Sequence, residues 1–342
     1  MRYKKIGIAI LTTTLFFSGC MNQKDENKKS IQKEESVTQI EGFNANDEED
    51  DKKKITTSIN AFLIDEKDEK ISKSLSSLGN KIEVSEEKEL EFKLKLSCQM
   101  ENDKNANIPI RLYVMADNKQ LEYTIKKSDV SYDEKQTFEV KNNKNADIQI
   151  AVRLNPNIKV ITFLVSAFPD EVPKTKEDIY SGMIAYPIIN EAYEKNTNKK
   201  EITGQYIPIK NENLDVDEEI HGLDITTKKI TNKNLKIEDT HFGEDTVVQK
   251  EKGGLFVVFS SETSDDYNYH LFVMCDGKLL QLNQKENGVF VQCEKGTKIF
   301  QYEIPKELLP ETGTHVFQAV AIPETKEFYG TYYTNKIRII IK

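Results

Sequence analysis

The sequence lacks tryptophan and has only four histidines and four cysteines among 342 residues. Without tryptophan, a module that binds sugars by ring stacking is disfavoured. None of the histidines stands in an H-E-x-x-H spacing or beside a cysteine pair, which disfavours a zinc centre. They are His221, His241, His270 and His315. From the sequence we expect no metal site.

Signatures of nucleophilic catalysis and of phosphate binding are also missing. The chain contains no G-x-S-x-G elbow, no G-x-x-x-x-G-K-[ST] loop and no G-x-G-x-x-G fingerprint. The acidic run Asp215 to Glu219 lacks the glycine and distal glutamate of a calcium loop, so we interpret it as solvated linker. These absences predict a protein that is not an enzyme and needs no cofactor.

Positive charge is in deficit, with 48 basic against 57 acidic residues and a formal net charge of −9. Because nucleic-acid phosphates would be repelled, a nucleic-acid partner is disfavoured. The only long apolar run is Ile6 to Phe17, which is too short to span a bilayer, since spanning takes roughly 20 residues.

That apolar run has the layout of an export signal. Arg2, Lys4 and Lys5 precede it, and Ser18-Gly19-Cys20 follows it at once. The stretch Phe17 to Cys20 resembles the lipobox of bacterial lipoproteins. This resemblance covers the first 20 residues and implies that the Cys20 sulfur receives a diacylglycerol and becomes the mature N-terminus. It predicts a signal peptide at 1–19 and a chain anchored by lipid to the extracytoplasmic face of the cell membrane.

Residues 20–54 are rich in Lys, Glu, Asp, Asn and Gln, with Phe43 as their single aromatic. Such a segment cannot bury enough apolar surface to offset the entropy of ordering, so we predict a disordered tether.

An internal repeat organises the rest of the chain. The segment RLYVMADNKQL at Arg111 to Leu121 returns as HLFVMCDGKLL at His270 to Leu280. Both copies read as a strand, a tight turn and a second strand, with Asn118 and Gly277 expected at the positive φ of the turn. By the period of two, we expect Val114 and Val273 to face a core.

Alternating apolar residues predict half-buried strands on both sides of each hairpin. One run holds Leu90 to Cys98, another holds Ile148 to Leu154, and we align Phe163 with Phe317 across the repeat. Two helical pieces suggest themselves, around Lys70 to Leu78 and at Pro305 to Leu309. Short strands with turns every 8 to 12 residues predict an all-β chain of two tandem immunoglobulin-like β-sandwich modules, at 55–210 and 211–342. A closed barrel is the alternative.

Three cysteines remain if Cys20 is lipidated. Cys98 falls on the inward face of its strand, which predicts a buried thiol. Cys275 and Cys293 are candidates for a disulfide in an exported protein, although a meander between them would hold their Cα atoms too far apart.

Aromatic residues gather in the second module and suggest a surface for a ligand or partner. Tyrosine offers contact area with a polar tip, as interfaces favour, but core and rim positions of a strand explain the same pattern. The candidates are Tyr267, Tyr269, Phe328, Tyr329, Tyr332 and Tyr333.

The sequence therefore favours a non-enzymatic surface lipoprotein that binds a protein, a peptide or a cell-envelope polymer. Two alternatives stay open. The first is an accessory lipoprotein of a transporter or of a toxin-immunity system, and the second is a hydrolase whose site is assembled from loops.

Overall fold

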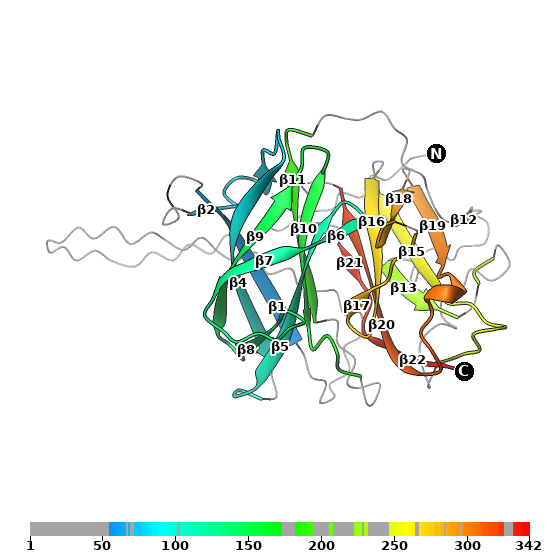
Figure 1. Ribbon diagram of the computed structural model, residues 1–342. Helices are drawn as coiled ribbons and strands as arrows, with labels where there is room; N and C mark the ends of the chain where they lie inside the picture. Colours follow the sequence, from blue (N-terminus) through cyan, green and yellow to red (C-terminus); the bar gives the residue numbers. More distant parts are fainter. Residues whose placement is uncertain are drawn as a thin grey trace, which may run out of the picture. The chain divides into compact units, whose positions relative to one another are not determined.

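A computed structural model gives the fold (Figure 1). It describes residues 55–342 except 66–67, 69–71, 101–102, 173–181, 194–204, 208–221, 228, 232–245, 264–266, 284, 294–295 and 325–330. The predicted signal peptide and tether lie outside the described residues. Within them the regular structure is β-strand apart from one 3-10 turn, η4 (Lys306–Leu308), so the all-β prediction is confirmed.

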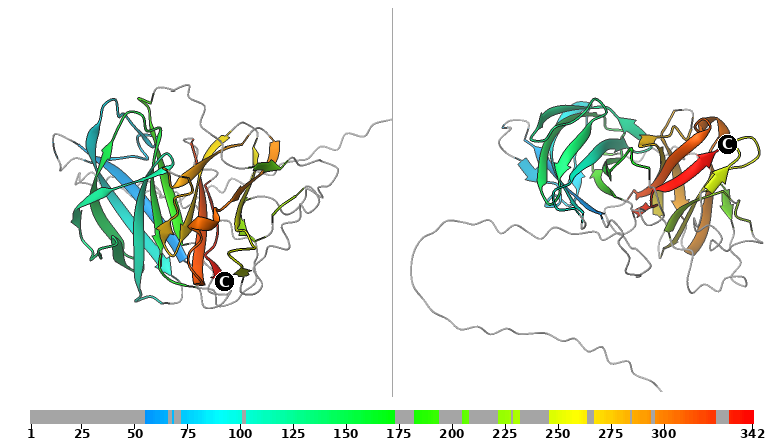
Figure 2. Two further views of the ribbon diagram at one scale, coloured as in Figure 1. Left: turned by 45° about the vertical axis from the view of Figure 1, so that its right-hand side comes forward. Right: turned by 90° about the horizontal axis from the view of Figure 1, so that it is seen from below.

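The first module is a sandwich of two mainly antiparallel sheets, seen as separate layers in Figures 1 and 2. One sheet has the order β2-β1-β4-β9-β7, and the other has the order β3-β11-β10-β5-β6 with β8 paired to β5. Their bounds are β1 (Ile55–Ile64), β2 (Ser72–Ser74), β3 (Lys81–Ile82), β4 (Lys88–Met100), β5 (Asn107–Ala116), β6 (Lys119–Leu121), β7 (Tyr123–Ser128), β8 (Thr137–Lys141), β9 (Asn145–Leu154), β10 (Val160–Ala167) and β11 (Met183–Asn190).

Strict alternation builds the core of this module. Along β4, Leu90, Phe92, Leu94, Leu96 and Cys98 are buried in turn, while the residues between them face outward. They meet the inward face of the other sheet, where Phe92 packs edge-on against Phe163 of β10 with ring centroids 5.1 Å apart. The period of two therefore predicted this face correctly.

The second module repeats this plan. One sheet has the order β12-β19-β15-β13, and the other has β14-β22-β20-β16-β17, with β18 paired to β16 and β21 to β20. Their bounds are β12 (Gln205–Ile207), β13 (Gly222–Thr226), β14 (Thr246–Val248), β15 (Phe256–Thr263), β16 (Tyr267–Cys275), β17 (Lys278–Leu279), β18 (Gly288–Cys293), β19 (Gly296–Glu303), β20 (Gly313–Pro323), β21 (Tyr332–Tyr333) and β22 (Ile337–Ile341). Both sandwiches fall in one compact unit, Glu41–Lys342.

The repeated segments occupy equivalent places. In each module the first hairpin strand, β5 or β16, pairs with the later strand β10 or β20, and a short strand, β3 or β14, runs parallel to the last one. Val114 and Val273 are both fully buried in the cores of their own modules, as predicted. The sequence repeat is therefore a structural repeat.

Two details of the predicted repeat are wrong. Ala116 pairs with Ile161 and its counterpart Cys275 pairs with Phe317, so Phe317 is equivalent to Ile161 and not to Phe163. Similar apolar runs in β10 and β20 had hidden this shift. The boundary near residue 210 is also misplaced, because β12 hydrogen-bonds to β19 and so belongs to the second module.

The two helical predictions had different outcomes. η4 forms at Lys306–Leu308, within the second predicted piece. In the first predicted piece, the described residues 72–78 form β2 followed by a turn, after which the Asn80 N–H bonds the Leu75 carbonyl at 2.8 Å. No helix in the described part of the chain is long and apolar enough to cross a membrane.

Candidate functional site

The two repeated hairpin turns are built around an aspartate. Asp117 and Asp276 both have a φ of 49°, a left-handed conformation that aspartate tolerates better than most residues. Each carboxylate accepts a backbone N–H from the neighbouring strand, from Val160 at 3.0 Å and from Val316 at 2.9 Å. Gly277 also has positive φ, but Asn118 does not, so in the first copy Asp117 takes the role expected of Asn118.

Each of these turns contacts the other module. Outward-facing residues of β5 and β10 pack against their counterparts in β16 and β20, so that Tyr113 and Met115 share one apolar cluster with Phe272 and Met274. We call this cluster the inter-module face; its buried members are Tyr113, Met115, Leu164, Met183, Ala185, Phe272, Met274, Val320 and Ile322. The strand face that points away from each core is therefore also buried.

One polar contact lies beside this face at the second module's turn. Arg111, 5% exposed, donates to the Gly277 carbonyl at 3.1 Å and to the Asp170 carboxylate from Nη1 and Nη2, at 3.0 and 2.7 Å. The Tyr113 hydroxyl donates to the same carbonyl at 2.5 Å. A Cβ on Gly277 would lie 2.7 Å from the Pro169 carbonyl oxygen and 2.8 Å from Arg111 Nη1, so only glycine fits.

A matching contact lies at the first module's turn. His270, the counterpart of Arg111, is 1% exposed, and its Nδ1 lies 2.7 Å from the Asn118 side-chain oxygen. Its Nε2 lies 3.0 Å from Glu324, which also pairs with Lys159 at 2.6 Å. Residue 111 thus reaches the turn at 277, and residue 270 reaches the turn at 118, which is the reciprocal pattern of a two-fold contact.

A buried lysine completes the junction. Lys336, 2% exposed, donates from Nζ to the Ala167 carbonyl at 3.1 Å and to the Phe168 carbonyl. Burial lowers the pKa of Lys336 to about 8. Its backbone partners lie in the first module, so this side chain also ties the two modules together.

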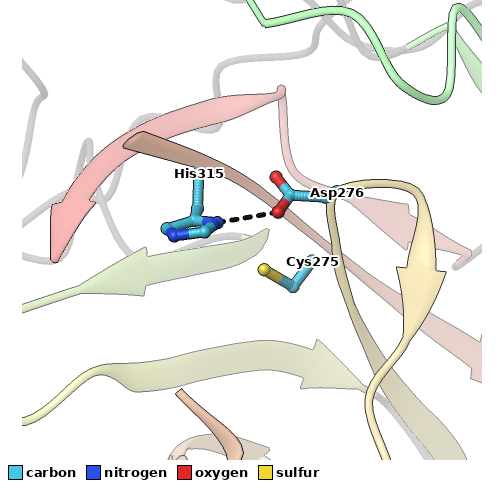
Figure 3. Close-up of side chains that lie close together, drawn as sticks. All are labelled: Cys275, Asp276 and His315. Atoms are coloured by element: carbon cyan, nitrogen blue, oxygen red, sulfur yellow. Dashed lines mark hydrogen bonds and ion pairs between the residues drawn. The ribbon is translucent and has the colours of Figure 1, made fainter. Parts of the chain in front are cut away.

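A second cluster of reactive side chains surrounds the Asp276 turn (Figure 3). Cys275, Asp276 and His315 place one sulfur, one carboxylate oxygen and one ring nitrogen within 4.8 Å of one another. His315 Nδ1 lies 2.7 Å from Asp276 Oδ2, and His315 Nε2 lies 2.9 Å from the Glu311 carbonyl oxygen. The sequence missed this group because His315 comes from the start of β20, far along the chain from the turn.

This cluster does not assemble a thiol nucleophile. Burial, with a further contribution from Asp276, raises the pKa of Cys275 to about 12, so the thiol is protonated at neutral pH. Both ring nitrogens of His315 already face acceptors, and neither is directed at the thiol by a hydrogen bond among the described contacts. An activated cysteine requires the opposite arrangement, with a lowered pKa and a base within reach.

The described aromatic residues of the predicted partner surface lie in different surroundings. Tyr269 is 3% exposed in the second core, and Tyr332 packs on it and on Phe259, with ring centroids 6.0 and 5.2 Å away. Tyr333 packs against the inter-module face, and its hydroxyl accepts the Ala185 N–H at 2.9 Å. Tyr267 begins β16, and its side chain, like Phe328 and Tyr329, lies outside the described residues.

The candidate disulfide between Cys275 and Cys293 is wrong. Cys275 is a free thiol, and Cys293 pairs with Tyr267 at the far end of β16. Since each residue of a strand advances about 3.3 Å, the two cysteines lie many times farther apart than a disulfide allows. Cys98 is free and 1% exposed, as predicted, and burial raises its pKa to about 11.

Comparison with known proteins gives no family. No protein-family description matches the sequence, and no curated protein matches it. Among solved structures, the secreted serine protease VesC from Vibrio cholerae aligns with 77% of this chain and 54% of its own, at 9% identity and a TM-score of 0.20. The chain spans about half the length of that protein, and a TM-score this low supports no inference about fold or activity.

Proposed function

We propose that this chain is a lipid-anchored, extracytoplasmic protein that binds a protein, a peptide or a cell-envelope polymer and does not catalyse a reaction. Its two modules, which we take to be immunoglobulin-like, would present one combined surface to the partner. Cys20 would hold the chain at the membrane, and residues 20–54 would separate the sandwiches from it.

The observation that carries this proposal is the contact between the modules. It buries an apolar cluster flanked by Arg111, His270 and Lys336, and each of these makes polar contacts across the junction. A small, polar interface would let the modules move, whereas a buried one favours a fixed arrangement. A fixed pair of sandwiches suits presentation of an extended surface better than closure around a solute.

The chemistry of the described side chains supports the non-enzymatic part. The protonated Cys275 thiol and the occupied ring nitrogens of His315 do not constitute a nucleophile and its base. Cys98, the other described thiol, is enclosed in the first core. The lipid anchor and the exported location rest on the first 20 residues of the sequence.

Binding and hydrolysis can be separated with the mature chain immobilised through its C-terminus. We would incubate it with solubilised envelope proteins and with cell-wall fragments, cross-link, and analyse both the beads and the supernatant by mass spectrometry. The proposal expects a retained ligand of unchanged mass. New cleavage products that accumulate with time would support the hydrolase alternative and contradict the proposal.

A matched variant tests whether the two modules act together. Met274→Asp places a charge in the inter-module face without touching either core, because Met274 points away from the second core. If the combined surface binds the partner, this variant loses retention while Asn107→Asp, an exposed change on β5, keeps it. Equal retention by both variants would contradict a combined surface.

A further inference from the structure

The cluster around the Asp276 turn has the composition of a metal site. We propose that Cys275, Asp276 and His315 bind a divalent transition-metal ion of the zinc class, through Sγ, Oδ2 and Nδ1 (Figure 3). Thiolate and imidazole ligands favour such ions over magnesium or calcium, which take oxygen ligands. One thiolate and one carboxylate would neutralise the two charges of the ion.

The orientation of His315 supports this assignment. A metal-binding histidine usually donates its second ring N–H to a carboxylate or a backbone carbonyl, which fixes the ring and leaves the other nitrogen unprotonated. His315 Nε2 lies 2.9 Å from the Glu311 carbonyl oxygen, and Nδ1 faces Asp276 Oδ2. With Nε2–H donated to Glu311, Nδ1 is the nitrogen left to bind the ion.

Asp276 is held in a similar way. Its Oδ1 accepts the Val316 N–H at 2.9 Å, while Oδ2 points to His315. The carboxylate can therefore keep its bond to the strand and still offer one oxygen as a ligand. The Asp276 side chain is 45% exposed and that of His315 is 17% exposed, so a water molecule has access to a fourth position.

The first module provides an internal comparison. Asp117 makes the same bond to its neighbouring strand, but Ala116 and Lys159 stand where the second module has Cys275 and His315. The turn therefore explains why both copies have an aspartate, Asp117 or Asp276. It does not explain why the second copy has Cys275 and His315.

Titration of the purified full-length chain with Co²⁺ tests the proposal, because cobalt replaces zinc and a thiolate ligand gives a charge-transfer absorption band. We expect the band to saturate at one equivalent and to be displaced by Zn²⁺ but not by Mg²⁺. Cys275→Ser and His315→Gln should abolish it, whereas Cys98→Ser should retain it. No band in the parent chain, or a band that survives in Cys275→Ser, would overturn the proposal.

A second measurement uses the parent chain and so does not depend on the folding of variants. Zn²⁺ should slow alkylation of Cys275 by a thiol reagent, followed by mass spectrometry, and leave the rate at Cys98 unchanged, because a thiolate bound to a metal is not free to react. An unchanged rate at Cys275 would count against the site.

Discussion

Single residues at the hairpin turns decide how closely the two sandwiches approach. Gly277 leaves room for Arg111 and for the Pro169 carbonyl, and Arg111 in turn spans from the turn to Asp170. The guanidinium is suited to this position because its planar fork can satisfy several acceptors at once. The contact therefore depends on the missing side chain of Gly277 and on the hydrogen bonds that the Arg111 guanidinium donates.

Gly277→Ala should destabilise the protein more than Gly79→Ala. The two glycines have nearly the same positive φ, 66° and 65°, so the conformational penalty of about 1–2 kcal/mol is shared. A Cβ at Gly79 meets nothing within 4 Å, but one at Gly277 collides with the first module, which adds roughly 1–3 kcal/mol. Urea unfolding measures both, and equal losses would mean that the modules do not meet at this turn.

Asp170→Asn should reduce the dependence of stability on acid pH. The hydrogen bonds from Arg111 hold the pKa of Asp170 below its ordinary value of 3.8. A lowered pKa stabilises the folded state above the ordinary value, and this contribution is lost as pH falls through the lowered one. The parent should therefore exceed the variant in unfolding free energy above the ordinary pKa of 3.8, and lose that advantage as the pH falls through the lowered pKa. A constant difference across this range would contradict the pairing.

Each repeated strand at the centre of a module has two buried faces with different partners. Along β5, Val114 lies in the module's own core, while Tyr113 and Met115 lie in the inter-module face. β16 divides Val273, Phe272 and Met274 in the same way. Burial on both sides requires a strand that is apolar on both faces. The segments Val114 to Ala116 and Val273 to Cys275 meet this requirement.

Val114→Asp should lower the unfolding free energy by roughly 3–5 kcal/mol, the scale of an uncompensated buried charge. Asn107→Asp on the same strand, where the side chain is exposed, should change it little. Since the modules share a buried face, the loss should also lower the melting temperature of the second module. Calorimetry that finds the second module's transition unchanged would show independent folding.

The sequence predicted the strands well and the contacts between modules poorly. Alternation identified the inward faces of β4, β5 and β9, because burial in a sheet follows a period of two. No local pattern says that Arg111 bonds Gly277 or that His315 lies beside Cys275, since both pairings arise when distant strands come together. The surroundings of the tyrosines could not be predicted for the same reason, since Tyr269 is buried in the second core and Tyr333 bonds Ala185 of the first module.

At the scale of the whole molecule, the proposed function requires three parts: a lipid anchor, a spacer and the two packed sandwiches. The first two rest on residues 1–54, which lie outside the described structure, and the third rests on the contacts between the sandwiches. Two acyl chains on one cysteine supply the strength that stable anchoring needs, at about 0.8 kcal/mol for each buried methylene.

Cys20→Ala should leave the precursor without its lipid and release the protein from the membrane or mislocalise it. Membrane fractionation followed by immunoblotting measures this, and the Cys98→Ser variant serves as the control because Cys98 is enclosed in the first core. Equal membrane retention of Cys20→Ala and the parent would show that the predicted lipidation of Cys20 is wrong.

The reciprocal contact has a consequence for how such a chain can arise and diverge. A surface that pairs with its own equivalent is what a symmetric dimer uses, so a duplicated gene that fuses two copies keeps the contact and gains the high effective concentration of a tether. The two copies in this chain are complementary and not identical. Two second modules would set His270 against Gly277, which has no side-chain oxygen for the Nδ1 contact. Two first modules would set Arg111 against Asn118, which carries the Cβ that Gly277 lacks at a place 2.8 Å from Arg111 Nη1.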